Sequence, residues 1–309
     1  MSKTALLFAG QGSQTVGMGR DLCGQFEVCA RLYTRANEIL DRDLQKICFE
    51  GPVELLTQTD NAQPAIFLTS LACWEALKTK VPDLQPEGAA GLSLGELTAL
   101  TVAKALRFDF ALRLVQTRGR FMQEACDTTR GSMASIIGMD EAPLATVCRE
   151  SGVDIANINC PGQIVISGDK EKVGQAVERA KTCGAKRAIP LTVAGAYHSR
   201  LMAGARQKLA SALATFPLRD PDFPVVSNVT ARPGANVADI RDLLARQVTS
   251  SVRWSESMQW LIGQGFTRFI ELGPGTVLSG LMKRINSTVE MITVNDGPSL
   301  EAAAAKLRG

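Results

Sequence analysis

The sequence is poor in the residues that build metal sites. It has one histidine, His198, and its eight cysteines are scattered, with no CxxC pair and no ladder of short spacings. Zinc sites usually show fixed, short spacings of cysteine and histidine, so we expect no metal site. The scatter also indicates reduced, mostly buried thiols rather than a disulfide framework.

The sequence also lacks an excess of charge and a long hydrophobic run. Lysine and arginine number 34, aspartate and glutamate 31, and the formal net charge is +3. Nucleic-acid binders usually carry a concentrated basic excess, so we expect no nucleic-acid partner. No apolar stretch approaches the length of a membrane span, and the run at 5–9 is too short for the core of a signal peptide. We therefore expect a cytoplasmic protein with no membrane partner.

What the sequence does have is an alternation of short apolar strands with longer helical segments. This alternation is typical of an α/β fold with a mostly parallel sheet. Pro64 is expected in the first turn of one helix, where no backbone donor is missed. The expected strands of this part lie at 4–9, 87–92, 225–227 and 268–271, and further helices at 21–40, 96–105 and 110–124.

A middle segment has a different pattern. Residues 127–195 predict the order strand, helix, strand, strand, helix, strand, which is typical of a small ferredoxin-like unit. The sequence therefore predicts two domains. A larger, α/β-hydrolase-like catalytic domain comprises residues 1–126 and 196–309, and a ferredoxin-like α+β subdomain of residues 127–195 is inserted into it.

The strongest local motif is Gly91-Leu92-Ser93-Leu94-Gly95. It matches the G-x-S-x-G nucleophile elbow and lies where an expected strand meets an expected helix. Small residues two before and two after let the serine occupy a sharp turn at a helix N-terminus. There the helix dipole and free N–H groups favour a developing negative charge. A glycine pair around a structural serine also arises by chance, but the strand–helix context favours a nucleophile.

A serine nucleophile needs a base, and His198 is the only imidazole in the chain. A lone histidine often has a structural role instead. The position of His198 in a loop after an expected strand favours catalysis, because catalytic residues are frequent on such loops. A third group must hold the ring, and either an acid or a carbonyl would serve.

The loop Gly10-Gln11-Gly12-Ser13-Gln14 follows the first expected strand. It fits neither a phosphate-binding P-loop nor a dinucleotide fingerprint. In folds with a nucleophile elbow, the oxyanion hole uses the N–H after the nucleophile and one from another loop. We therefore assign the backbone N–H groups of Leu94 and Gln11, with a simple tight turn as the alternative for the loop.

Several blocks in order resemble the malonyl-CoA:acyl carrier protein transacylases of bacterial fatty acid synthesis, over essentially the whole chain. The matching blocks are the loop 10–14, the elbow block 91–96, and the segments 116–122, 159–163, 165–168, 195–202, 227–229, 246–247, 252–254 and 271–275. The resemblance implies transfer of a malonyl group from malonyl-CoA to acyl carrier protein by a ping-pong mechanism, through an ester on Ser93. It implies malonyl-CoA, CoA and acyl carrier protein as partners and no cofactor, and we expect a monomer.

The resemblance also implies residue roles. Ser93 is the nucleophile and His198 the base, while Arg118 pairs with the malonyl carboxylate, a task suited to a planar guanidinium. Without the resemblance, Arg118 is indistinguishable from a surface arginine. The main-chain carbonyl of Gln247 is implied to orient His198, and Asn228 to help line that region of the pocket.

One position departs from the family pattern. The family usually has histidine before the nucleophile, and here that residue is Leu92, which leaves the polarity of the pocket beside the malonyl group open. The alternatives are a related acyltransferase of polyketide assembly or for another acyl-CoA, a serine hydrolase, and an inactive scaffold. Arg118 and the lack of a triad acid argue against the hydrolase, and the intact Ser93 and His198 argue against the scaffold.

Overall fold

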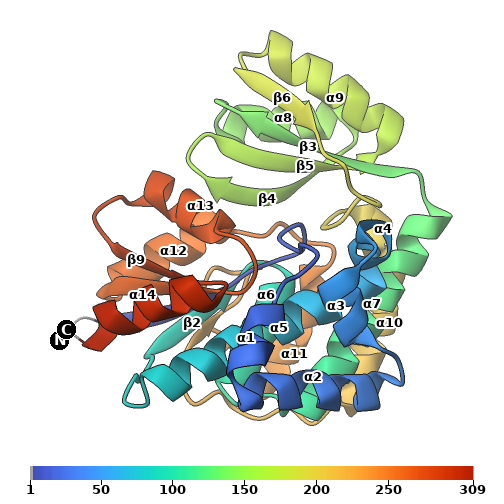
Figure 1. The fold of residues 1–309 in the computed structure, drawn as a ribbon. Helices are drawn as coiled ribbons and strands as arrows, with labels where there is room; N and C mark the ends of the chain where they lie inside the picture. The colour runs from blue at the N-terminus through green and yellow to red at the C-terminus, as the bar shows by residue number, and fades with distance from the viewer. Residues whose placement is uncertain (1–2, 309) are drawn as a thin grey trace.

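The computed structural model describes residues 3–308, which form two sheets with helices packed against each (Figure 1). The strands are β1 (Lys3–Phe8), β2 (Gly88–Gly91), β3 (Gly131–Ile137), β4 (Asp154–Cys160), β5 (Gln163–Asp169), β6 (Arg187–Pro190), β7 (Val225–Val226), β8 (Phe266–Leu272) and β9 (Glu290–Val294). The helices are α1 (Arg20–Gln25), α2 (Glu27–Leu40), α3 (Leu44–Glu50), α4 (Val53–Thr57), α5 (Thr59–Lys80), α6 (Leu94–Val102), α7 (Phe108–Thr128), α8 (Glu141–Ser151), α9 (Lys170–Thr182), the short 3₁₀ helix η1 (Arg200–Met202), α10 (Ala203–Thr215), α11 (Val237–Gln247), α12 (Trp254–Gly263), α13 (Val277–Ile285) and α14 (Gly297–Arg308).

The larger sheet is parallel throughout and has the strand order β7-β2-β1-β8-β9. Alternate side chains of its central strand enter two different cores. Leu6 and Phe8 pack with residues of α5 on one face, whereas Ala5 and Leu7 pack with residues of α12 on the other. Because helices cover both faces, the strand reads as a continuous apolar run, as expected for a buried parallel sheet.

The smaller sheet is antiparallel and has the order β4-β5-β3-β6. With α8 and α9 it forms a βαββαβ unit with its own apolar core, seen in green and yellow at the top of Figure 1. The unit also pairs with the larger part of the chain, because Val252 and β4 exchange backbone hydrogen bonds of 2.8 and 2.9 Å. The predicted fold class, a parallel α/β part with an inserted α+β subdomain, is confirmed.

Some local expectations differ from the structure. Pro64 does not open its helix, since α5 begins at Thr59 and contains the proline. A proline within a helix leaves the carbonyl four residues earlier without its N–H partner. Here that carbonyl belongs to Asp60, and the Arg42 side chain donates to it at 2.8 Å. The helix expected at 21–40 is two helices, which meet at the extended residue Phe26.

The predicted domain boundaries stay a prediction. The first of them, between residues 126 and 127, falls in the last turn of α7, and the antiparallel unit begins at Gly131. Across residues 3–308, none of the helices combines the length and the apolar character that crossing a membrane requires.

Candidate functional site

Ser93 lies in a tight turn between β2 and α6. Its backbone has φ 54° and ψ −99°, a strained conformation for a residue with a side chain. The flanking glycines are required by close approach, since a Cβ on Gly91 would lie 1.9 Å from the Gly95 carbonyl carbon. A Cβ on Gly95 would lie 2.2 Å from the Phe8 oxygen. The geometry is that of a nucleophile elbow, with the serine at the helix N-terminus.

His198 contacts the serine directly. Its Nε2 lies 2.8 Å from Ser93 Oγ, and its Nδ1 lies 2.8 Å from the main-chain oxygen of Gln247. Because a carbonyl oxygen only accepts, Nδ1 carries the ring proton and Nε2 is free to accept from the hydroxyl. A carbonyl therefore occupies the place of the third group, for which the sequence left an acid or a carbonyl open.

The environment of His198 keeps its ring neutral. Burial and, next, the nearby Arg118 guanidinium lower the pKa of His198 from 6.5 to about 4. The ring is therefore unprotonated near pH 7, which is the state that a general base needs.

Arg118 points its guanidinium at the same serine. Its Nη2 donates to Ser93 Oγ at 3.0 Å and to Gln247 Oε1 at 2.8 Å, and its Nη1 donates to Gln63 Oε1 at 2.6 Å. The side chain is 2% exposed. Burial lowers its pKa to about 10, so it remains a cation near pH 7.

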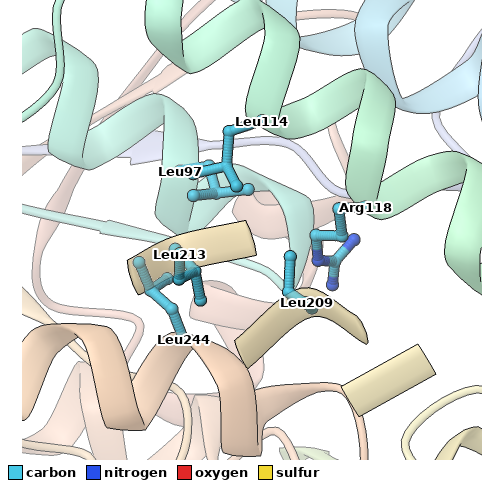
Figure 2. Close-up of a pocket in the computed structure, with 6 residues that line it drawn as sticks. All are labelled: Leu97, Leu114, Arg118, Leu209, Leu213 and Leu244. Carbon is cyan, nitrogen blue, oxygen red and sulfur yellow. The ribbon is translucent and has the colours of Figure 1, made fainter. Parts of the chain in front are cut away.

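Two packing features place this cation. Gly119 lets α7 approach the start of α5, because a Cβ there would lie 2.9 Å from the Thr59 oxygen. Figure 2 shows Arg118 at the edge of an apolar space too narrow for a water molecule. That space is lined by Leu97, Leu114, Leu209, Leu213 and Leu244. Water is therefore excluded from one side of the arginine, which strengthens its interaction with any anion on the other.

The two expected oxyanion donors, Leu94 and Gln11, both lie near Ser93. Leu94 is the first residue of α6, and Gln11 lines the cleft that contains Ser93. Within residues 3–308, no hydrogen bond is found from the backbone N–H of either residue, so both are available to an anion. The Gln11 side chain is held by Tyr197 Oη at 3.3 Å and by Gln63 Nε2 at 3.3 Å.

The cleft has a volume of about 260 Å³ and lies between the two sheets. Ser93, His198 and Leu92 line it from the larger part of the chain, and Asn159 on β4 lines it from the smaller unit. Leu92 thus gives an apolar wall next to Ser93. A molecule that reaches Ser93 through this cleft therefore passes between walls that come from both parts of the chain.

Asn228 lies beside the elbow and beside Gln247, whose Nε2 donates to its Oδ1 at 3.4 Å, and its role as a pocket residue stays a prediction. It is fully buried, and its Oδ1 accepts from the Ser93 N–H at 2.6 Å while its Nδ2 donates to the Gly91 oxygen at 2.8 Å. It bridges the two sides of the elbow and so stabilises the strained turn.

Two site residues were missed by sequence reasoning. Gln63 holds Arg118, and Glu96 accepts from Gln247 Nε2 at 2.7 Å and from the Asn228 N–H at 2.9 Å. A signal was present for Glu96, a charged residue in the mostly apolar stretch 94–100, where a polar side chain needs a partner. Gln63 carried no such signal, since the polar residues 59–61 precede it in the same helix.

Known proteins were compared with this chain. A family model described as "Acyl transferase domain" matches residues 5–303. A "Malonyl CoA-acyl carrier protein transacylase" of Bacillus subtilis (strain 168) is 48% identical over 313 residues, which cover 100% of this chain and 98% of the relative.

Solved structures agree. An acyl carrier protein S-malonyltransferase from Vibrio cholerae O1 biovar eltor superposes with a TM-score of 0.94 at 42% identity, covering 97% of this chain and 99% of the other. A malonyl-transacylase in complex with its type II PKS acyl-carrier protein gives a TM-score of 0.95 at 40% identity, covering 99% and 100%. The chain therefore belongs to the family of malonyl-CoA:acyl carrier protein transacylases.

Proposed function

We propose that this protein transfers a malonyl group from malonyl-CoA to the phosphopantetheine thiol of an acyl carrier protein, through an ester on Ser93. The observation that carries the proposal is the buried guanidinium of Arg118, 3.0 Å from Ser93 Oγ beside the Ser93–His198 pair. A hydrolase of neutral esters has no use for a fixed cation at its nucleophile. An enzyme whose acyl group ends in a carboxylate needs such a cation to pair with that carboxylate.

In the first half of the reaction, His198 Nε2 accepts the Ser93 hydroxyl proton as Oγ attacks the thioester carbon. The oxyanion of the tetrahedral intermediate accepts from the N–H groups of Gln11 and Leu94. The carbon–sulfur bond then breaks, and CoA leaves with the proton from His198. Meanwhile Arg118 exchanges its contact with Ser93 for the malonyl carboxylate and keeps its contact with Gln247.

The second half reverses these roles. The carrier thiol gives its proton to His198, and its sulfur attacks the ester carbon. Ser93 leaves and takes the proton back, so the side chains end as they began. The steps use only side chains and backbone donors, and they need no cofactor. A cytoplasmic location and a monomeric state stay predictions.

The carrier could belong to fatty acid synthesis or to polyketide assembly. The similarity to a malonyl-transacylase that is bound to a type II PKS carrier supports keeping the second as an alternative. Transfer rates to purified carriers of each kind, measured side by side, distinguish them.

The low pKa of His198 predicts an unusual pH dependence. We expect kcat/KM for formation of the malonyl ester not to decline as the pH is lowered from 8 to about 5. The neutral ring is the base, and it is lost only as the pH falls through its pKa of about 4. Stopped-flow or quenched-flow acylation rates across this range give the profile. A rate that falls to half of its maximum near pH 6.5 would instead show that the pKa of His198 is that of an exposed histidine.

Replacing Arg118 by alanine tests the acyl specificity. A hydrogen bond to a charged group contributes about 1.5–3 kcal/mol, so malonyl transfer should fall by about one to two decades. Transfer of acetyl, which has no carboxylate, should fall far less. The measurement is transfer from malonyl-CoA and from acetyl-CoA to the holo carrier protein, reported as a ratio.

Arg120→Ala is the matched control, because Arg120 lies on the same helix with its side chain 64% exposed. It should leave the ratio unchanged. An equal loss of malonyl and acetyl transfer in Arg118→Ala would make Arg118 a structural residue and remove the basis of the proposed specificity.

A further inference from the structure

Glu96 is a buried carboxylate at the site to which the proposed reaction gives no role. It lies in the first turn of α6 and is 3% exposed. A buried carboxylate is costly unless it is paired and hydrogen-bonded. Glu96 follows Ser93 by three residues, and so lies about one helical turn from that residue.

The contacts of Glu96 lead to Arg118 through a single amide. Gln247 Nε2 donates to Glu96 Oε2 at 2.7 Å, and Gln247 Oε1 accepts from Arg118 Nη2 at 2.8 Å. An amide nitrogen only donates and an amide oxygen only accepts. An acceptor at residue 96, together with the Ser93 carbonyl oxygen 2.9 Å from the same nitrogen, therefore holds the Gln247 amide in the orientation that presents its oxygen to the arginine.

Glu96 and Arg118 also form a balanced pair of buried charges. Burial raises the pKa of Glu96 to about 7, and hydrogen bonds and the charge of Arg118 oppose that rise. Among the described residues packed around α6, from β1, β2, β7, α5 and α7, Arg118 is the one charged side chain whose field acts on Glu96. The other titratable groups of the site are neutral near pH 7, since His198 has a pKa of about 4 and Tyr197 of about 12.

We propose that Glu96 is a positioning residue for Arg118 that takes up a proton when an acyl carboxylate pairs with that arginine. The inference rests on the proposed function, which supplies the carboxylate. A malonyl group brings a second negative charge to a buried region whose charges are already balanced. An unbalanced buried charge is costly, and a proton from solvent on Glu96 restores the balance. The neutral acid keeps an oxygen that accepts from Gln247.

The experiment counts protons on binding. In a Ser93→Ala background, which prevents chemistry, malonyl-CoA and acetyl-CoA are titrated by calorimetry at pH 8 in two buffers of different ionisation enthalpy. Acetyl-CoA carries the same CoA, so its proton count is subtracted. We expect malonyl-CoA to take up about one proton more than acetyl-CoA, because Glu96 is ionised before binding and protonated after it.

The sign of the pH dependence follows. Binding that raises a pKa is favoured by protons. Because the pKa of Glu96 before binding is about 7, the ratio of malonyl-CoA to acetyl-CoA affinity should fall by up to about fivefold between pH 7 and pH 8. Glu96→Gln should abolish both the extra proton and this pH dependence, whereas Glu96→Asp should restore part of each. Glu141→Gln, the same change in the first turn of α8, is the control and should behave as the parent.

Equal proton counts for the two ligands would overturn the inference, whether or not Glu96→Gln folds. So would an extra proton that persists in Glu96→Gln. Failure of the proposed function looks different, because then the wild-type protein forms no malonyl ester at all.

Discussion

Ser93→Ala should abolish attachment of malonyl to the protein. Mixed with malonyl-CoA, the wild-type chain should gain one malonyl group by intact mass, and the alanine variant none. The only bond that the proposed first step forms is to Ser93 Oγ, and alanine lacks that atom. Because this substitution should remove the reaction entirely, its expected effect is the largest among the variants that we propose.

Thr57→Val is the matched control, since Thr57 lines the same cleft with a hydroxyl. It should gain malonyl as the wild type does. Peptide mapping should place the group on Ser93. A label on a cysteine, or a label that persists in Ser93→Ala, would show that the nucleophile is elsewhere.

His198→Ala should fold and lose transfer by about 10²–10⁴-fold, the typical contribution of a general base. No other histidine exists to replace it, and the ring lies within hydrogen-bond distance of Ser93 Oγ and the Gln247 carbonyl. The measurement is the rate of transfer from malonyl-CoA to the carrier, with circular dichroism and thermal unfolding to check the fold.

Added imidazole gives a second readout for this variant. The truncation leaves a ring-sized space beside Ser93, so free imidazole should restore part of the rate in a concentration-dependent way. Turnover near the wild-type rate in a well-folded His198→Ala protein would assign the base to another group.

The contact between Ser93 and His198 could be predicted from sequence, because the turn is encoded by neighbouring residues and the chain has one histidine. Gly91 and Gly95 encode the turn around Ser93, because a Cβ at either of these two positions would clash. His198 was the only histidine that could serve as the base. The order of strands and helices in residues 127–195 was similarly local, and the antiparallel unit follows it.

Other features depended on contacts between distant segments. Arg118 reads as an ordinary helical arginine, and only packing of α7 against α5 turns it toward Ser93, so resemblance alone identified it. Pro64 was expected at a helix start because a proline inside a helix removes a hydrogen bond, and here Arg42, from the turn between α2 and α3, donates to the carbonyl left without its partner. Glu96 lies in the quoted elbow block, but its partner Gln247 is 151 residues away.

These long separations also bear on how the site forms during folding. The Ser93–His198 contact joins residues 105 positions apart, and the Gln247–Ser93 contact joins residues 154 apart. We expect these contacts to form late in folding, because the chain between the two residues must lose conformational entropy before the contact can compensate for it. The strand pairing of β8 beside β1 requires the chain beyond Gln247 as well. Recovery of acyl transfer after denaturation therefore reports completion of the native topology, rather than early collapse or helix formation.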